Sequence, residues 1–389
     1  MSPIPPELIA AIVDELADDR ESLKACSLVA TAFCAPSQSF IFRSIWLHRE
    51  NWRFYTLQQR YFELGTSVPS GTIQGCHFLL EKSPHLAAYI RDLTIDLPDS
   101  TSEDLPLEHI LMASPNIERF VISGLDVSWT DLSPSLVTAL QGVMAQPTLT
   151  RLHLLGIRDV PFSAVARALS AQKVLSAHST TLANDDSGSQ FWHPRTGRLE
   201  HLILIGYKPG MAPIYELLLS PRSPSLAHVM RLSLRLDAHS RRLAERLLAA
   251  AAETLHHLTL DCDRLEFELT LPPLPQLRTL ELRILLGFAR RFPDALPGTL
   301  AALPRTNLTL VFGISRSISE GPWPDTGRML GLENWETDRV HCRLLFLDSN
   351  MTRKLAFQVF CVAIGVALPA LDIEFSQMDR MRPYVSRLP

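Results

Sequence analysis

The sequence has few of the features that mark secreted, metal-binding or nucleic-acid-binding proteins. Its 389 residues include six scattered cysteines and no Cys-x-x-Cys pair, so we expect neither a disulfide framework nor a structural zinc site. The N-terminus shows no basic segment followed by an apolar run, which argues against a secretory signal. A net charge of −4 and a pI of about 6.4 give no sign of a basic, nucleic-acid-binding surface. We therefore expect a cytoplasmic and/or nuclear protein without a nucleic-acid partner.

Motifs of common catalytic sites are also missing. The chain contains no P-loop, no Gly-x-Gly-x-x-Gly, no Gly-x-Ser-x-Gly elbow and no His-Glu-x-x-His. Asp261 and Asp263 lack the glycine turn of a calcium loop, so we interpret them as the solvent-facing end of a strand. His256 and His257 are neighbours and would face opposite sides of a strand. The thinly spread histidines form no ligand cluster along the sequence, and we expect no catalytic residue, cofactor or metal.

One apolar stretch raises the question of a membrane anchor. Residues 355–371 are apolar except for Gln358 and include Gly365 and Pro369. Seventeen residues lie at about the lower limit for crossing a bilayer. A buried helix that closes the end of the core is the simpler interpretation, and we expect no membrane contact. A protein tethered to membrane through this segment stays a less favoured alternative.

What the sequence does contain is a repeated leucine pattern in a chain that is 46% hydrophobic. Short segments alternate an apolar residue with a residue of solvent-facing type, and an apolar residue often stands three positions earlier. Most successive segments are separated by steps near the roughly 20–29-residue period of leucine-rich repeats. The segments are Leu93-Thr94-Ile95, Phe120-Val121-Ile122, Leu152-His153-Leu154, Leu202-Ile203-Leu204, Leu232-Ser233-Leu234, Leu258-Thr259-Leu260, Leu280-Glu281-Leu282 and Leu308-Thr309-Leu310.

This spacing predicts parallel strands joined by helical connections. Helices are expected at 134–144, 163–171 and 241–255, and 174–175 is a weak candidate for an additional strand. A β-sandwich would repeat its strands at about 8–12 residues, which is too short. A doubly wound sheet would show long Val/Ile runs and a glycine-rich first turn, which are absent. We predict an α/β solenoid with a parallel sheet on its concave side and helices on its convex side, the units sharing one core.

The first 47 residues differ from the remainder. Leu8, Ile9, Ile12, Val13 and Leu16 form the apolar stripe of an amphipathic helix that starts after two prolines. A second helix is expected from about Ser22, with Phe33 among its apolar positions, and Pro36 ends it or begins a new turn. Residues 65–75, rich in Ser, Thr, Gly and Pro, predict a loop.

Three segments together resemble the F-box. They are 4–16, 22–33 and 42–45, and they are most similar to the F-box-like proteins that mushroom-forming fungi carry in large numbers. The junction at 83–95 also resembles that group. The resemblance implies a three-helix unit that docks on the Skp-type adaptor of a cullin ubiquitin ligase. The residues that match positions used for adaptor contact or for the small core of that unit are Pro5, Pro6, Leu8, Ile9, Ile12, Leu28, Val29 and Phe33.

The resemblance implies four regions and separate surfaces for adaptor and target. We expect an F-box at 1–47, a helical and loop linker at 48–85, a leucine-rich-repeat-like solenoid at 86–345 and a C-terminal cap at 346–389. An unknown protein target would contact side chains between or beside the core leucines. The candidates are Arg151, His153, His201, Arg235, His257, Glu281 and Arg283.

One departure from the family pattern leaves a second function open. Phe33 stands where many F-boxes carry tryptophan. Phenylalanine also provides an aromatic ring, but it lacks the indole N–H that could donate a hydrogen bond. A leucine-rich protein-binding scaffold that is not engaged with a ligase is therefore the alternative.

Overall fold

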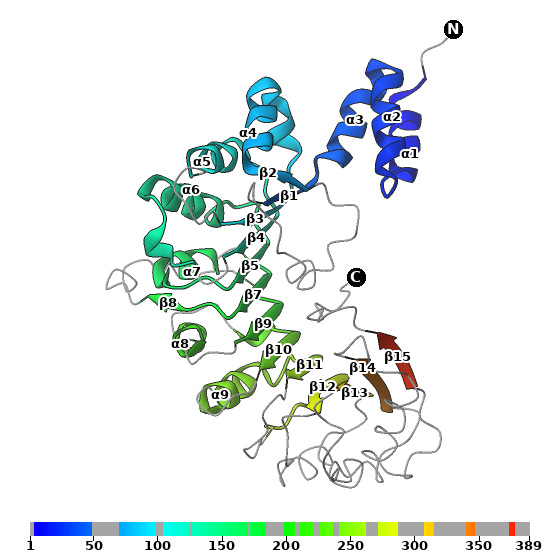
Figure 1. Ribbon diagram of the computed structural model, residues 1–389. Coiled ribbons are helices and arrows are strands. Elements are labelled where there is room, and N and C mark those ends of the chain that lie inside the picture. Colours follow the sequence, from blue (N-terminus) through cyan, green and yellow to red (C-terminus); the bar gives the residue numbers. More distant parts are fainter. Residues whose placement is uncertain are drawn as a thin grey trace. The chain divides into compact units, whose positions relative to one another are not determined.

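The computed structural model describes thirteen stretches of the chain, and its α/β architecture is built on a large parallel sheet (Figure 1). Two compact units are resolved by their internal contacts: residues 1–55, 63–172 and 180–193 form unit 1, and residues 56–62, 173–179 and 194–389 form unit 2. The described residues are 4–48, 70–97, 104–124, 127–169, 172–183, 198–206, 211–220, 226–235, 241–261, 271–286, 307–314, 340–346 and 373–377.

Unit 1 begins with three helices that have a core of their own. Buried Ile9, Val13, Leu23 and Ile41 form this core, and Leu16, Phe33, Phe40 and Phe42 pack against it. The helices are α1 (Pro6–Glu15), α2 (Arg20–Val29) and α3 (Thr31–Ile41).

The helix boundaries after α1 differ from the prediction. The second helix starts at Arg20 rather than near Ser22, because Asp19 caps it by accepting hydrogen bonds from the Ser22 amide (3.1 Å) and hydroxyl (2.6 Å). Those hydrogen bonds, the side-chain one first, lower the pKa of Asp19. Extended Ala30 then separates α2 from α3.

Pro36 neither ends a helix nor begins a turn. It lies inside α3, at the cost of one intrahelical hydrogen bond. Burial of Ile41, one turn further along α3, keeps the end of that helix packed on the small core.

The remainder of unit 1 repeats a strand followed by a helical connection. Its parallel strands lie in the order β2-β1-β3-β4-β5, and β6 pairs with β8. The strands are β1 (Ser44–His48), β2 (Ser70–Thr72), β3 (Asp92–Asp96), β4 (Arg119–Ser123), β5 (Arg151–Leu155), β6 (Val160–Pro161) and β8 (Leu182–Ala183). The helices and short 3-10 turns are α4 (Ile73–Lys82), η2 (Pro84–Tyr89), α5 (Asp104–Ala113), η4 (Trp129–Asp131), α6 (Pro134–Met144) and α7 (Phe162–Ala168).

Unit 2 continues the same alternation. Its parallel strands lie in the order β7-β9-β10-β11-β12-β13-β14-β15. The strands are β7 (Val174–His178), β9 (His201–Ile205), β10 (Arg231–Arg235), β11 (His257–Asp261), β12 (Thr279–Leu286), β13 (Asn307–Ile314), β14 (Val340–Phe346) and β15 (Ile373–Gln377). The described helical segments are α8 (Ala212–Leu219), η7 (Leu226–His228) and α9 (Arg241–Ala251).

All eight leucine-pattern segments are strands, and the weak candidate at 174–175 is strand β7. Helix α6 has the predicted bounds, while α7 and α9 end before theirs. The predicted loop at 65–75 is partly wrong, because Ser70–Thr72 pairs with β1 and α4 starts at Ile73, capped by the Thr72 side chain. Residues 355–371 lie outside the described residues.

Several successive repeats join through the same backbone contact. The Arg91 carbonyl accepts the amides of Glu118 and Arg119 at 2.7 and 3.0 Å. The Glu118 carbonyl accepts those of Thr150 and Arg151 in the same way. In unit 2 the Glu200 and Met230 carbonyls repeat the pattern. Each fork sets the register between the two strands that it joins, so residues at matching positions of those strands lie side by side in the sheet.

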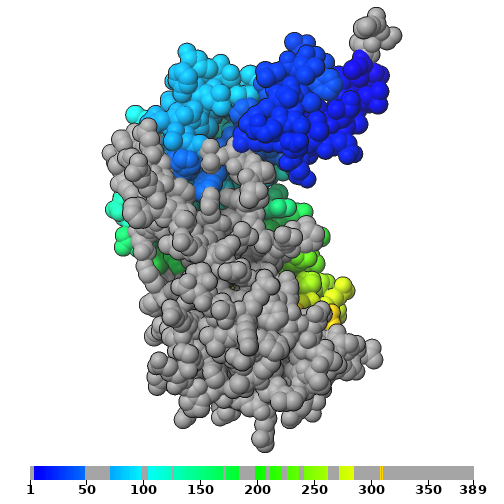
Figure 2. Space-filling model, turned by 45° about the vertical axis from the view of Figure 1, so that its right-hand side comes forward, coloured from blue at the N-terminus to red at the C-terminus, as the bar shows by residue number. Residues whose placement is uncertain are grey.

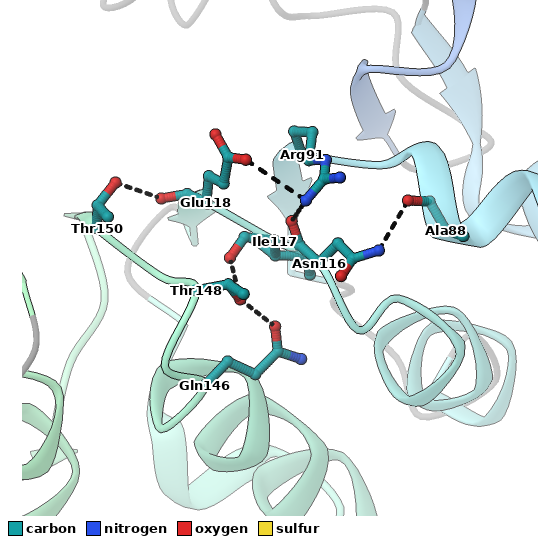
Figure 3. Close-up of polar contacts among 8 residues, drawn as sticks. All are labelled: Ala88, Arg91, Asn116, Ile117, Glu118, Gln146, Thr148 and Thr150. Atoms are coloured by element: carbon teal, nitrogen blue, oxygen red, sulfur yellow. Dashed lines mark hydrogen bonds and ion pairs between the residues drawn. The ribbon is translucent and has the colours of Figure 1, made fainter. Parts of the chain in front are cut away.

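Side chains reinforce this junction in unit 1 (Figure 3). The Asn116 amide donates to the Ala88 carbonyl (2.9 Å), and the Thr148 hydroxyl donates to the Ile117 carbonyl (3.0 Å). Arg91 lies 3.4 Å from the Glu118 carboxylate. The Asn116 and Thr148 hydrogen bonds give a partner to the Ala88 and Ile117 carbonyls, which precede strands β3 and β4.

Candidate functional site

The three-helix unit of residues 6–41 exposes large apolar side chains on two of its helices. On α1, Leu8 is 55% exposed and Ile12 is 44% exposed, while on α2 Leu28 and Val29 are 86% and 77% exposed. Leu8 and Ile12 are one turn apart and so share a side of α1. We call these four residues the apolar surface of the three-helix unit. Residues 4–48 are drawn in blue in Figure 2.

The adaptor-contact candidates divide between this surface and the core. Leu8, Ile12, Leu28 and Val29 are exposed, and so are Pro5 and Pro6 at the start of α1. Ile9 is 6% exposed and belongs to the core, against which Phe33 packs as a half-buried ring. A unit of this size has little core, and apolar side chains left in water at such density typically mark a binding surface.

A second candidate surface is the sheet face formed by the strand residues that alternate with the buried leucines. In unit 1 this face is polar and largely buried: Thr94, Asp96, Ser123 and His153 are all less than 9% exposed. The Trp46 indole Nε1 donates to Asp96 at 3.0 Å, which pairs part of the buried charge. Buried polar groups that are hydrogen-bonded in this way fix the sheet face rather than offer it to a ligand.

In unit 2 the same face carries paired charges. Arg235 and Asp261 are register partners with an Nη1–Oδ2 distance of 3.9 Å. On the next strand, the Arg283 guanidinium donates to Glu281 at 2.6 Å. The two ion pairs follow β10, β11 and β12 in order, so the charges largely balance one another.

Histidines on this face have lowered pKa values. Burial, followed by the charge of Arg283, lowers the pKa of His178 to about 4. Burial lowers that of His257 too, with Arg231, His256 and Arg278 adding to the effect. The His178 imidazole is consequently neutral at physiological pH.

The target-contact candidates occupy different environments. Arg151 is exposed, whereas His153 and Arg235 are buried. The other candidates are half-buried: His201, His257, Glu281 and Arg283. Register places His201, Arg231 and His257 side by side on β9, β10 and β11. Arg151 and His153 belong to unit 1 and the others to unit 2, so they form two groups.

Two groupings were missed by sequence reasoning. Asp261 was interpreted as a solvent-facing strand end, yet it is half-buried and faces Arg235. His77, Glu81 and His109 lie together although the histidines looked scattered along the chain. A signal was available for the second group, because His77 and Glu81 are four residues apart on a helix and His109 follows one repeat later.

No family model matches the chain, and no curated protein matches it. The two candidate surfaces are therefore interpreted from their geometry. Within the described part of the chain, no helix has the length and apolarity needed to cross a membrane.

Proposed function

We propose that this chain is a substrate-recognition subunit of a Skp-cullin-F-box ubiquitin ligase, in which the F-box at residues 1–47 binds a Skp-type adaptor. The observation that carries the proposal is the apolar surface of the three-helix unit. Its four residues are among those that the F-box resemblance assigns to adaptor contact. The unit also has a core of its own, so the surface residues are not needed to hold it together.

On this proposal the repeats downstream form a leucine-rich solenoid that holds a target. The recurring carbonyl fork and the all-parallel strand order within each unit support a repeat architecture in which each strand adds to the one before. No bond is made or broken by the chain itself. It raises the effective concentration of a target beside a ubiquitin-loaded enzyme.

Burial reduces the number of residues that we propose for target contact. Arg151 is the exposed candidate, and the half-buried candidates are His201, His257, Glu281 and Arg283. His153 and Arg235 are less than 9% exposed, so we assign them to support of the sheet face. Direct contact with a folded target would require side chains that reach solvent.

The test is a pull-down of purified Skp-type adaptor with the full chain. We expect Leu28→Asp and the double variant Leu8→Asp/Ile12→Asp to abolish adaptor capture. Leu105→Asp is the matched control, since Leu105 on α5 is 73% exposed and lies outside the three-helix unit. All three variants should keep the wild-type far-ultraviolet circular dichroism, because none removes a core side chain.

The outcomes separate the two functions that the sequence allows. Capture by the wild type and the control, but not by the surface variants, supports the ligase subunit. Absence of capture by the wild type at micromolar adaptor would refute the proposal and favour a leucine-rich scaffold not engaged with a ligase. Phe33 is relevant to that alternative because its ring packs against the core and lacks an indole donor. A Phe33→Trp variant that gains capture would locate the deficit at this position.

A further inference from the structure

Two helices of consecutive repeats in unit 1 bring three potential metal ligands together. His77 and Glu81 lie one turn apart on α4, and His109 lies on α5. All three side chains reach solvent, His77 being half-buried and the other two exposed. The group lies on α4 and α5, outside the three-helix unit and its apolar surface.

The three side chains approach closely. His77 Nδ1 and His109 Nδ1 are 3.2 Å apart, and the ring centroids are 5.0 Å apart with the rings inclined at 67°. Glu81 Oε1 lies 3.6 Å from His77 Nε2. One donor atom from each residue can be chosen so that all three lie within 4.8 Å of one another.

These distances suit a divalent transition metal. Zinc binds imidazole nitrogen at about 2.0–2.1 Å, so two nitrogens on a tetrahedral ion lie about 3.3 Å apart. The 3.2 Å separation of the two Nδ1 atoms is close to that value. Two imidazoles and one carboxylate favour zinc and its first-row neighbours over calcium or magnesium, which prefer all-oxygen sites.

The ligands stand on rigid supports, yet an ion can reach them. Ile73 and Leu80 anchor α4, and Leu107 and Ile110 anchor α5, all in the core beneath the helices. The exposed Glu81 carboxylate lies 3.6 Å from the Nε2 edge of the His77 ring and turns toward the Nδ1 edge to complete the ligand set. Cys76, next to His77 in the sequence, is 8% exposed and belongs to the buried side of α4, so it is not part of the group.

We propose that His77, Glu81 and His109 form a zinc-class metal site that bridges α4 and α5, with the histidines coordinating through Nδ1 and Glu81 as the third donor. Water completes the coordination shell on the solvent side. The bound ion ties together the helices of two consecutive repeats, so it strengthens unit 1 locally. This site is independent of adaptor binding.

Isothermal titration calorimetry of the untagged full chain with Zn²⁺ at pH 7.5 tests the site. We expect saturable binding of one ion that weakens at least about a hundredfold in His77→Gln or His109→Gln, since each removes one of three ligands, and about tenfold or more in Glu81→Gln. His228→Gln, a change at an exposed histidine on η7, should leave the affinity unchanged.

Two outcomes would overturn the proposal: no saturable binding by the wild type, or equal affinity in His77→Gln and His109→Gln. A Co²⁺ adduct should show a nitrogen/oxygen ligand spectrum, and a thiolate charge-transfer band would assign the ion to cysteines instead. Hydrogen exchange on the wild type gives a readout that does not depend on any variant. Zn²⁺ should slow exchange in peptides covering α4 and α5, and unchanged exchange there also refutes the site.

Discussion

Two leucines on helix α2 give a sharp test of the three-helix unit. Leu23 is 1% exposed in the core, whereas Leu28 is 86% exposed. Truncation of a buried leucine to alanine costs about 3 kcal/mol, while a surface substitution typically changes stability by less than about 0.5 kcal/mol. At roughly 0.05–0.15 kcal/mol per residue, a unit of this length is stable by only about 2–5 kcal/mol. Leu23→Ala therefore removes most of its stability, and Leu28→Ala removes almost none.

Hydrogen exchange measured by mass spectrometry reports this difference directly. A loss of about 3 kcal/mol raises the population of the open unit about a hundredfold, so amides of α1, α2 and α3 should exchange about a hundredfold faster in Leu23→Ala. Leu28→Ala should exchange at the wild-type rate, and strands of unit 2 should be unchanged in both variants. Wild-type exchange in Leu23→Ala, or equal acceleration in the two variants, would refute the division of α2 into a core side and a free side.

Three further predictions concern the sheet and one turn. The unfolded chain takes up a proton at His178 near pH 6.5, and the folded chain does so only near pH 4. The free energy of unfolding therefore falls as the pH falls through this window, by about 2 kcal/mol between pH 7 and pH 4.5. Urea titrations at both pH values should show a smaller difference in His178→Gln. Trp46→Phe should cost about 1–3 kcal/mol, because it deprives buried Asp96 of a hydrogen-bond donor; an unchanged urea midpoint would contradict this bond. Gly156→Ala should cost about 1 kcal/mol, since the φ angle of 61° is left-handed, and a thermal melt that matches the wild type would show that the turn relaxes.

Sequence periodicity predicted the strands well because each has its own local signal. Alternation of a leucine with a solvent-type residue predicts a strand, and the eight such segments are strands. The helix predicted at 134–144 has these bounds, and the Ser133 hydroxyl accepts the Leu136 amide at its start. Boundaries failed where two helices are nearly continuous. A single extended residue, Ala30, separates α2 from α3, and no local pattern marks it.

The apolar stripe of α1 illustrates the limit of such patterns. It correctly predicts an amphipathic helix, but it contains more apolar residues than the small core accepts. Ile9 and Val13 enter that core, while Leu8 and Ile12 stay in water. Periodicity shows which side of a helix is apolar, and only packing against α2 and α3 shows how much of that side is covered.

The sequence by itself determined the α/β class, the positions of most strands and the amphipathic start of the chain, because these depend on neighbours a few residues apart. The tertiary structure alone decided which of those residues meet. The Arg235–Asp261 pair depends on strand register, and the approach of His77 to His109 depends on how α4 and α5 pack. Both join residues more than twenty positions apart, whose distance is set by the whole core rather than by any local pattern.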